Sequence, residues 1–568
     1  MGITGKYLIF KFMAKMIFFT FYLILLIHPA IFGQQDLDRD VVVVKTYMPT
    51  IADAFKISSL PKINDTAVVH PVFEYTVAST QIKTSFRPEP VNPAKLLSEP
   101  LPHLYGNYLK LGIGTQLNPM AELYINSLWS RKNSWGVYLK HFSANAKTKV
   151  NGDTYYPWLS ENKALLTGTQ FLTKSTLTGR LEFNSNKYFR YGYDPDSMVL
   201  VKDDIKRRIF TLINADATYR SNYITGDKLN YLSGIDYYFF GDNLKSRENS
   251  FSFKVDIDEK YKGYYLGIKS GISFYNQADA NDLSTSQTYI EVSPFATRKG
   301  EEWEYTVGIK TSTEINPDEN AKLHIYPDLK FSFIIVDKIM TSYFGFTGKN
   351  DINSYRKLAE NNPYYYANQY IDDDGNYRIN SDPTNYKKII YGGLRGYISK
   401  RLSYNAVVKF SETSGHVFYL ADSTGNCFTD ISDNLDIFDI SGELAYKTEK
   451  LEIRASGNIY SYAAMDSIIK PSYMPAYNID ISAGYNLKDK ILLNCELIFA
   501  GERNAVNIYN KSETLGSIAD INLGAEYRYT KKMSAFLNLN NIANQKYFIW
   551  QHYPSWGFNV MFGVTYAF

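Results

Sequence analysis

Cysteine and histidine are scarce in this chain of 568 residues. It holds 2 Cys and 7 His, too few for a disulfide framework or a zinc cluster to organise a fold of this length. An excess of one charge is also missing, because 61 Lys and Arg against 58 Asp and Glu leave a net charge of +3. That balance excludes binding of nucleic acid through bulk charge.

Long apolar runs are missing beyond the N-terminus. No stretch of 18 apolar residues occurs after residue 104, so we expect no transmembrane helix there. Aromatic residues are abundant instead, with 49 Tyr and 34 Phe. This content excludes wholesale disorder. It is compatible with membrane β-strands, in which apolar and polar residues alternate. The mean hydropathy of −0.29 is compatible with them too, because the polar residues of such strands offset the apolar ones.

The N-terminus has the three parts of a secretory signal peptide. Lys6, Lys11 and Lys15 precede the apolar run 16–27 (MIFFTFYLILLI), and the small residue Gly33 follows it. A basic segment, a short apolar segment and a small residue are typical of a cleaved signal. We therefore expect residues 1–33 to be removed; the alternative is a short N-terminal anchor helix.

Proline sets residues 34–104 apart from the rest. Eight prolines lie between Pro49 and Pro102, and proline interrupts both helices and strand ladders. We expect a periplasmic arm, or a truncated domain, without a core of its own. Its one β-prone run is 38–44 (DRDVVVV).

From residue 105 to residue 568 the chain alternates apolar and polar residues in long segments. In the last segment one face holds the larger side chains, and the other face holds small or polar ones. A soluble sandwich would also give half-apolar strands, but its strands are usually about 5 or 6 residues long. The length of these segments, and the Lys, Asp, Glu and Arg on their polar faces, favour an all-β fold, a transmembrane antiparallel barrel.

The connections alternate between short turns, most with Lys or Arg, and longer loops, the longest spanning 349–386. Outer-membrane barrels have short periplasmic turns and longer external loops. The segments number about 22, an even count that places both ends of the barrel in the periplasm, beside the arm. Two segments, 164–171 and 416–420, fit either a strand or a loop, which leaves the count open by two.

The C-terminal end is the most specific feature. The segment 537–547 (LNLNNIANQKY), then Tyr553-Pro554, then a strand ending in Phe568, resembles the end of TonB-dependent receptors. The composition resembles that of Bacteroidetes-type members. The resemblance implies a 22-strand barrel that binds or transports a solute and is embedded in outer-membrane lipid. It also implies that Val564, Tyr566 and Phe568 are the signal by which the outer-membrane insertion machinery recognises the barrel.

The chain departs from this family at its N-terminus. TonB-dependent receptors carry a folded plug of well over a hundred residues, whereas only 34–104 are available here. The run 38–44 is a candidate TonB box, and the alternative is an ordinary exposed edge strand. Two functions therefore stay open: a solute transporter that contacts TonB, and a non-transporting subunit that anchors or assembles an envelope complex with a surface lipoprotein partner.

Sites for chemistry are few, and we expect neither an enzyme nor a cofactor. No nucleophile elbow, phosphate-binding loop or H-E-x-x-H motif occurs, and His416 near Ser414 is the one pair a hydrolase could use. The acidic cluster Asp372, Asp373, Asp374 and Asn376 is a weak calcium candidate, and a solvated turn is its alternative.

The longest loop and the two cysteines carry four further predictions. Residues 354–361 (SYRKLAEN) predict a short helix in the longest loop. The aromatic cluster 363–366 that follows either binds a partner or anchors the loop. Cys427 in a loop and Cys495 within a strand are predicted to lie too far apart for a disulfide.

Overall fold

Alternating side chains arrange the chain as a single closed sheet. A computed structural model describes residues 105–127, 130–194, 202–222, 228–279, 284–317, 320–366, 370–371, 377–378, 382–463 and 465–568. The expected signal peptide, the arm with its candidate TonB box, and the acidic cluster 372–376 lie outside these residues.

The sheet has 22 antiparallel strands, each paired with its neighbours along the chain. The last strand, β30 (Asn559–Ala567), pairs with the first, β1 (Asn107–Gly114), from Tyr108 opposite Ala567 to Gly114 opposite Met561, and this seam closes the barrel. The strand count is therefore confirmed, and the two uncertain segments belong to β6 and β19. The other wall strands are β2 (Met120–Asn126), β3 (Asn133–Asn145), β6 (Trp158–Phe171), β7 (Ser175–Phe189), β8 (Arg207–Ser221), β9 (Asn230–Asp242), β10 (Arg247–Tyr261), β11 (Tyr264–Ala278), β12 (Ser284–Lys299), β13 (Trp303–Ile315), β14 (Lys322–Val336), β15 (Met340–Asp351), β18 (Thr384–Ser399), β19 (Leu402–Ala421), β20 (Phe428–Lys447), β21 (Leu451–Ala463), β22 (Tyr477–Leu487), β23 (Ile491–Ala500), β26 (Ile518–Arg528) and β27 (Met533–Asn540).

The outer face of the wall is apolar and uncovered. On β7 and β8, for example, Leu181, Phe183 and Ile213 are 55%, 45% and 49% exposed. A soluble sandwich would bury these side chains against a second sheet, so that alternative is wrong. The exposed apolar belt instead suits contact with lipid.

The inner face is polar and is crossed by ion pairs between neighbouring strands. Examples are Lys163 with Glu182 at 2.7 Å, Lys310 with Asp328 at 3.3 Å, and Lys409 with Asp439 at 2.7 Å. Pairing lets charged groups lie close together on the wall of the lumen without repelling one another. The outer face of each strand therefore suits lipid, and the inner face of the same strand suits water.

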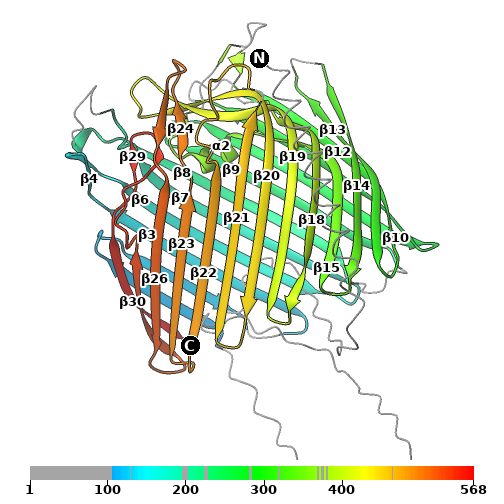
Figure 1. The fold of residues 1–568 in the computed structure, drawn as a ribbon, viewed down its shortest axis with the longest axis horizontal. Helices are drawn as coiled ribbons and strands as arrows, with labels where there is room; N and C mark the ends of the chain where they lie inside the picture. The colour runs from blue at the N-terminus through cyan, green and yellow to red at the C-terminus, as the bar shows by residue number, and fades with distance from the viewer. Residues whose placement is uncertain are drawn as a thin grey trace, which may run out of the picture. The chain divides into compact units, whose positions relative to one another are not determined.

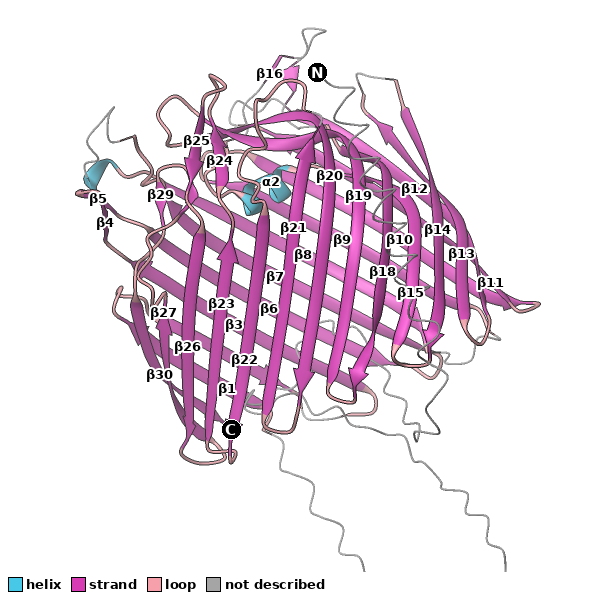
Figure 2. Cartoon of the chain, in the orientation of Figure 1, coloured by secondary structure: helices cyan, strands magenta, loops and turns pink. Residues whose placement is uncertain are grey.

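The two ends of the barrel differ in the length of their connections. At the end that carries the C-terminus, at the bottom of Figure 1, most strands are joined by short turns, as predicted. We call this the short-turn end and the other the loop end. The loop end holds four two-stranded hairpins and α2 (Tyr355–Asn361) (Figure 2). The hairpins are β4 (Thr148–Val150) with β5 (Asp153–Tyr155), β16 (Tyr370–Ile371) with β17 (Tyr377–Arg378), β24 (Arg503–Val506) with β25 (Ser512–Leu515), and β28 (Phe548–Trp550) with β29 (Tyr553–Pro554); a short 3-10 turn, η2, spans Lys202–Asp204. No helix among the described residues is long and apolar enough to cross a membrane.

Candidate functional site at the loop end of the barrel

The connection from β15 to β18, residues 352–383, is the longest in the described chain, and we call it the strap. Its first part forms the predicted helix, α2, which begins after Ser354, whose hydroxyl accepts from the backbone N–H of Lys357 at 3.2 Å. This contact is the usual N-cap, which supplies a partner to a free amide at the helix start. Tyr355, Leu358 and Ala359 point away from solvent.

The start of α2 is tied to β10 by a buried carboxylate. Glu248 accepts from the backbone N–H of Tyr355 at 2.7 Å and of Arg356 at 3.3 Å. Tyr238 on β9 donates its hydroxyl to the same carboxylate at 2.7 Å. A negative group at a helix start is favourable, because the free amides there carry partial positive charge. Glu248 therefore fixes both the position and the direction of α2.

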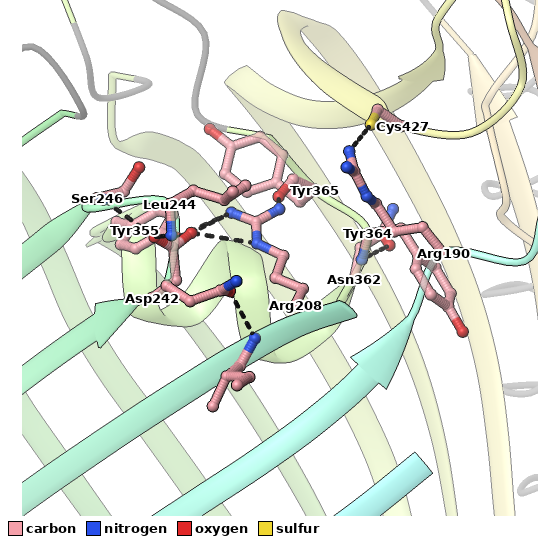
Figure 3. Close-up of polar contacts among 12 residues, drawn as sticks. Arg190, Arg208, Asp242, Leu244, Ser246, Tyr355, Asn362, Tyr364, Tyr365 and Cys427 are labelled. Carbon is pink, nitrogen blue, oxygen red and sulfur yellow. Dashed lines mark hydrogen bonds and ion pairs between the residues drawn. The ribbon is translucent and has the colours of Figure 1, made fainter. Parts of the chain in front are cut away.

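A buried ion pair holds the strap to β8 and β9. Arg208 donates to Asp242 at 2.8 and 3.1 Å, and Tyr355 donates its hydroxyl to the same carboxylate at 2.8 Å (Figure 3). Arg208 also donates to the backbone carbonyl of Tyr365 and, at 2.9 Å, to the hydroxyl of Tyr355. Both charges are thus satisfied without water, which buried charges require.

The far side of the strap is bound to β19 and β20. Tyr419 donates its hydroxyl to the carbonyl of Leu358 at 2.9 Å, and Tyr365 donates to Asp430 at 2.9 Å. Backbone bonds join Tyr366 N–H to the Phe428 carbonyl and Phe428 N–H to the Tyr364 carbonyl, at 2.7 and 3.2 Å. The strap therefore forms a parallel β-bridge with the first residue of β20.

The two anchoring regions lie almost opposite each other in the wall. Eight strands separate β8 from β19 on one side of the circuit, and twelve separate them on the other. The strap contacts β8 and β9 through Phe210, Leu212 and Phe240, which alternate with the exposed apolar residues of those strands. The strap therefore crosses the lumen near the loop end.

At the loop end, aromatic side chains from the strap and from several loops form what we call the aromatic cap. The rings of Tyr364 and Tyr553 stack with centroids 3.7 Å apart, and Tyr191 meets Tyr553 edge-on at 4.9 Å. Stacked and edge-on pairs stabilise beyond the area they bury. Trp550 and Tyr473 pack against its edge. The buried members of the cap are Tyr155, Tyr191, Tyr193, Tyr364, Ala421, Phe428 and Tyr553.

Burial sets the protonation of the cap tyrosines and of Tyr365 in the strap. Loss of water raises the pKa of Tyr364, Tyr365 and Tyr553 well above the usual value for tyrosine. These phenols stay protonated at neutral pH and act as donors, as Tyr553 does to the Asn426 carbonyl at 2.7 Å. Neutral aromatic contacts thus join the loops at this end, beside a charged, hydrogen-bonded strap. Among the described residues, no three His, Cys, Asp or Glu side chains gather closely enough to hold a metal ion.

The predicted loop features fall into this site. The helix expected at 354–361 is α2, and the aromatic cluster 363–366 anchors the strap, since Tyr364 and Tyr365 are buried. Cys427 lies in the loop between β19 and β20, where Arg190 donates to its sulfur at 3.0 Å. Cys495 lies on β23, and both cysteines are free, as predicted.

Other predicted residues lie away from the strap. Val564, Tyr566 and Phe568 point outward from the end of β30 and are exposed, with the rings of Tyr566 and Phe568 stacked 5.6 Å apart. His416 lies in β19 with its ring against Phe418 at 4.9 Å. The acidic cluster Asp372, Asp373, Asp374 and Asn376 is in the undescribed part of the strap.

Sequence reasoning missed Arg208, Asp242 and Glu248. A signal was present, because strands β8 and β9 lose their alternation at the loop end, where apolar residues occupy both faces. By its letters alone, the run 237–240 (YYFF) fits an interfacial aromatic girdle. The structure separates its residues, since Tyr237 is exposed while Tyr238 and Phe240 are buried against α2.

Comparison with known proteins gives structural neighbours only. No protein-family model matches the chain, and no curated protein matches it. Solved structures do match. The FrpB iron transporter from Neisseria meningitidis (F3-3 variant) has a TM-score of 0.65 at 10% identity, covering 82% of each chain. The pyoverdine outer membrane receptor FpvA from Pseudomonas aeruginosa PAO1, bound to pyoverdine, has a TM-score of 0.62 at 12% identity, covering 82% of this chain and 79% of its own. The ferric-catecholate import receptor Fiu from K12 E. coli has a TM-score of 0.61 at 9% identity, covering 82% of each chain. At these identities the likeness establishes the fold, a closed 22-strand β-barrel.

Proposed function

We propose that this chain is an outer-membrane barrel of the TonB-dependent receptor type, which binds a solute at its loop end and carries it across the outer membrane. The observation that carries this proposal is a strap tied to two nearly opposite walls at the loop end, beside an aromatic cap. An open barrel of this width would leak. A lumen crossed by its own loops suits selective passage instead.

The wall supports the same proposal. Its outer face is an apolar belt that matches lipid, and its inner face is polar and ion-paired, as a water-filled path requires. The fold neighbours include an iron transporter and a pyoverdine-bound receptor. Iron chelates are therefore the first class of solute to test on this chain.

The finer parts of the proposal concern partners and origin. Energised transport would need TonB to pair with the run 38–44, whose valines suit edge-strand addition. Delivery to the membrane would need the insertion machinery to recognise the end of β30. That the chain is of Bacteroidetes type, with an arm in place of a full plug, rests on composition and on the length of residues 34–104.

Binding and uptake are tested separately. Membrane fractionation and heat-modifiable gel mobility of the full chain should place a folded barrel in the outer membrane. Ferric chelates are then titrated into the purified protein, with Trp550 fluorescence as the readout because that ring lies against the cap. A Trp550→Phe variant identifies its share of the signal. Saturable quenching by one chelate, together with chelate-dependent growth of the native host, is the expected result.

The two open functions give different outcomes. A barrel that binds no solute, changes no uptake when deleted, and co-purifies with a stoichiometric surface lipoprotein is an assembly subunit, and the transport proposal is then wrong. Deletion of 38–44 addresses TonB: uptake should be lost while chelate binding to the purified protein is unchanged.

A further inference from the structure

The short-turn end carries a ring of exposed basic side chains. Ten of those in the turns have no ion pair with any residue that the structure describes, and they come from seven turns of the wall. We call this ring the basic collar. Its members are Arg131, Lys132, Lys174, Lys262, Arg401, Lys450, Lys488, Lys490, Lys531 and Lys532.

Backbone geometry indicates that turn formation alone does not explain these lysines. Lys262 and Lys488 have φ of 48° and 53°, in the left-handed region. Side chains with a Cβ are disfavoured there, and Gly, Asn and Asp are the residues that turns prefer. At the loop end, four of the eight described non-glycine residues with positive φ are Asn; at the short-turn end three of four are Lys and none is Asn. A lysine kept in a strained position suggests a use for its charge.

Aromatic neighbours place the collar at the depth of lipid headgroups. Tyr261 and Tyr529 are 59% and 68% exposed and directly precede collar turns. The ammonium of Lys262 lies 5.2 Å from the ring centre of Tyr261. Exposed Tyr and Trp at strand ends mark the boundary between the apolar belt and the headgroups. Cations just beyond this boundary therefore lie at phosphate depth rather than far out in solution.

We propose that the basic collar binds the phosphate groups of anionic phospholipids in the membrane leaflet at the short-turn end. An anionic surface attracts each basic side chain held near it, and the attraction is screened by salt. Lys and Arg around the rim would enrich such lipids next to the barrel and fix its depth and tilt. The inference goes beyond solute transport and needs only that the barrel lies in a membrane.

The test compares two double variants of the full chain, reconstituted in vesicles of phosphatidylcholine with phosphatidylglycerol. Lys262→Asn with Lys488→Asn removes two collar charges while giving the turns a residue that accepts left-handed φ. The matched control, Lys245→Asn with Lys511→Asn, removes two exposed lysines at the loop end, of which Lys245 also has positive φ, 72°. Spin-labelled lipids measure how strongly each lipid associates with the barrel.

We expect the wild type to prefer phosphatidylglycerol at low salt and to lose this preference in 1 M NaCl. The collar variant should lose about a fifth of the preference, since it removes two of the collar's ten cations and each one attracts nearby headgroups, while the control keeps it. Equal preference in all three proteins overturns the proposal. So does capture of an acidic periplasmic protein by the collar with no lipid preference. Failure to insert into vesicles at all would instead contradict the proposed function.

Discussion

The guanidinium of Arg208 lies 2.8 Å from the carboxylate of Asp242, and the two side chains are 1% and 0% exposed. These residues come from neighbouring wall strands. The strap supplies the remaining partners of Arg208, whereas Asp242 also accepts from the backbone N–H groups of Leu244 and Ser246. The guanidinium is therefore fully paired only when the strap is docked. Because Arg208 depends on the strap for hydrogen-bond partners, displacing the strap would leave a buried charge in the wall only partly paired.

Replacing Arg208 with Met should release the strap. The change leaves Asp242 buried without its cation, a loss of about 3–5 kcal/mol for buried pairs. We expect trypsin to cut after Arg356 or Lys357 in the variant much faster than in the wild type, while heat-modifiable mobility shows an intact wall. Arg180→Met is the control, because its pair with Asp216 is on the same wall but Arg180 is 55% exposed. Equal cleavage in both variants would mean that the ion pair does not hold the strap.

The face of the wall on which a residue lies predicts how much an introduced arginine destabilises the barrel. Ile481 on β22 belongs to the apolar belt, and its neighbour Ser482 faces the lumen. Arg at 481 should lower the free energy of unfolding by about 2–4 kcal/mol if it lies near the bilayer midplane. Arg at 482 should cost little, because the lumen is wet. Urea unfolding of both variants in vesicles measures this, and similar losses at the two positions would contradict the assignment of faces.

Deleting Phe568 should impair assembly in cells more than refolding in detergent. Its ring is half exposed, and its backbone exchanges two hydrogen bonds with Asn107, each 3.0 Å. Losing these two bonds should lower folded-state stability by only about 1–3 kcal/mol. Phe562→Ala is the control, since that ring is on the same face of the same strand. If the deletion weakens detergent refolding as much as it weakens assembly, Phe568 acts through stability and not through recognition.

Alkaline pH should open the aromatic cap. An unfolded tyrosine has a pKa of about 10, and burial raises the pKa of Tyr364 and Tyr553 above this in the folded cap. The neutral phenol is favoured by folding, so this stability is fully present below about pH 10 and is lost as the pH rises further. The Trp550 emission, taken as wild type minus Trp550→Phe, should shift to the red above about pH 10. Tyr364→Phe cannot ionise and should move the shift to higher pH; an unchanged transition would show that other groups drive it.

The arm should be dispensable for folding the wall. The seam between β1 and β30 is made entirely within residues 107–568, and the arm's prolines suit no ladder. We expect a chain lacking residues 34–100 to keep the heat-modifiable mobility of the wild type. Loss of the folded band would show that the arm helps to form the barrel.

Much of the wall could be predicted because strand alternation is local. Leu181 and Glu182, or Ile481 and Ser482, differ in polarity because the pleat sends them to different solvents, and this pattern can be counted along the sequence. Turns such as 488–490 follow from the polar residues that interrupt it. The same locality explains why the helix at 354–361 was found.

The site could not be predicted in the same way. Arg208 meets Tyr365, and Glu248 meets Tyr355, only because the circuit brings β8, β10 and the strap together. Contacts between residues far apart in sequence leave no periodic trace. Alternation visibly fails at 237–240. An interfacial aromatic girdle and an inner face covered by a loop would both produce this sequence, however, so the sequence does not distinguish them. Which apolar residues face a loop is decided by where that loop folds.

The seam has a consequence for how the barrel comes into being. Val560 N–H donates to the hydroxyl of Thr115, a residue 445 positions earlier in the chain. Strand pairs elsewhere in the wall join neighbours and can form in order, but this contact must wait until the last strand has been made. Until then the growing sheet has two unpaired edges, each able to pair with another chain. Ring closure is therefore the slowest and most aggregation-prone step in the folding of this protein. A factor that keeps the edge of β1 unpaired until β30 arrives would determine the yield of folded barrel.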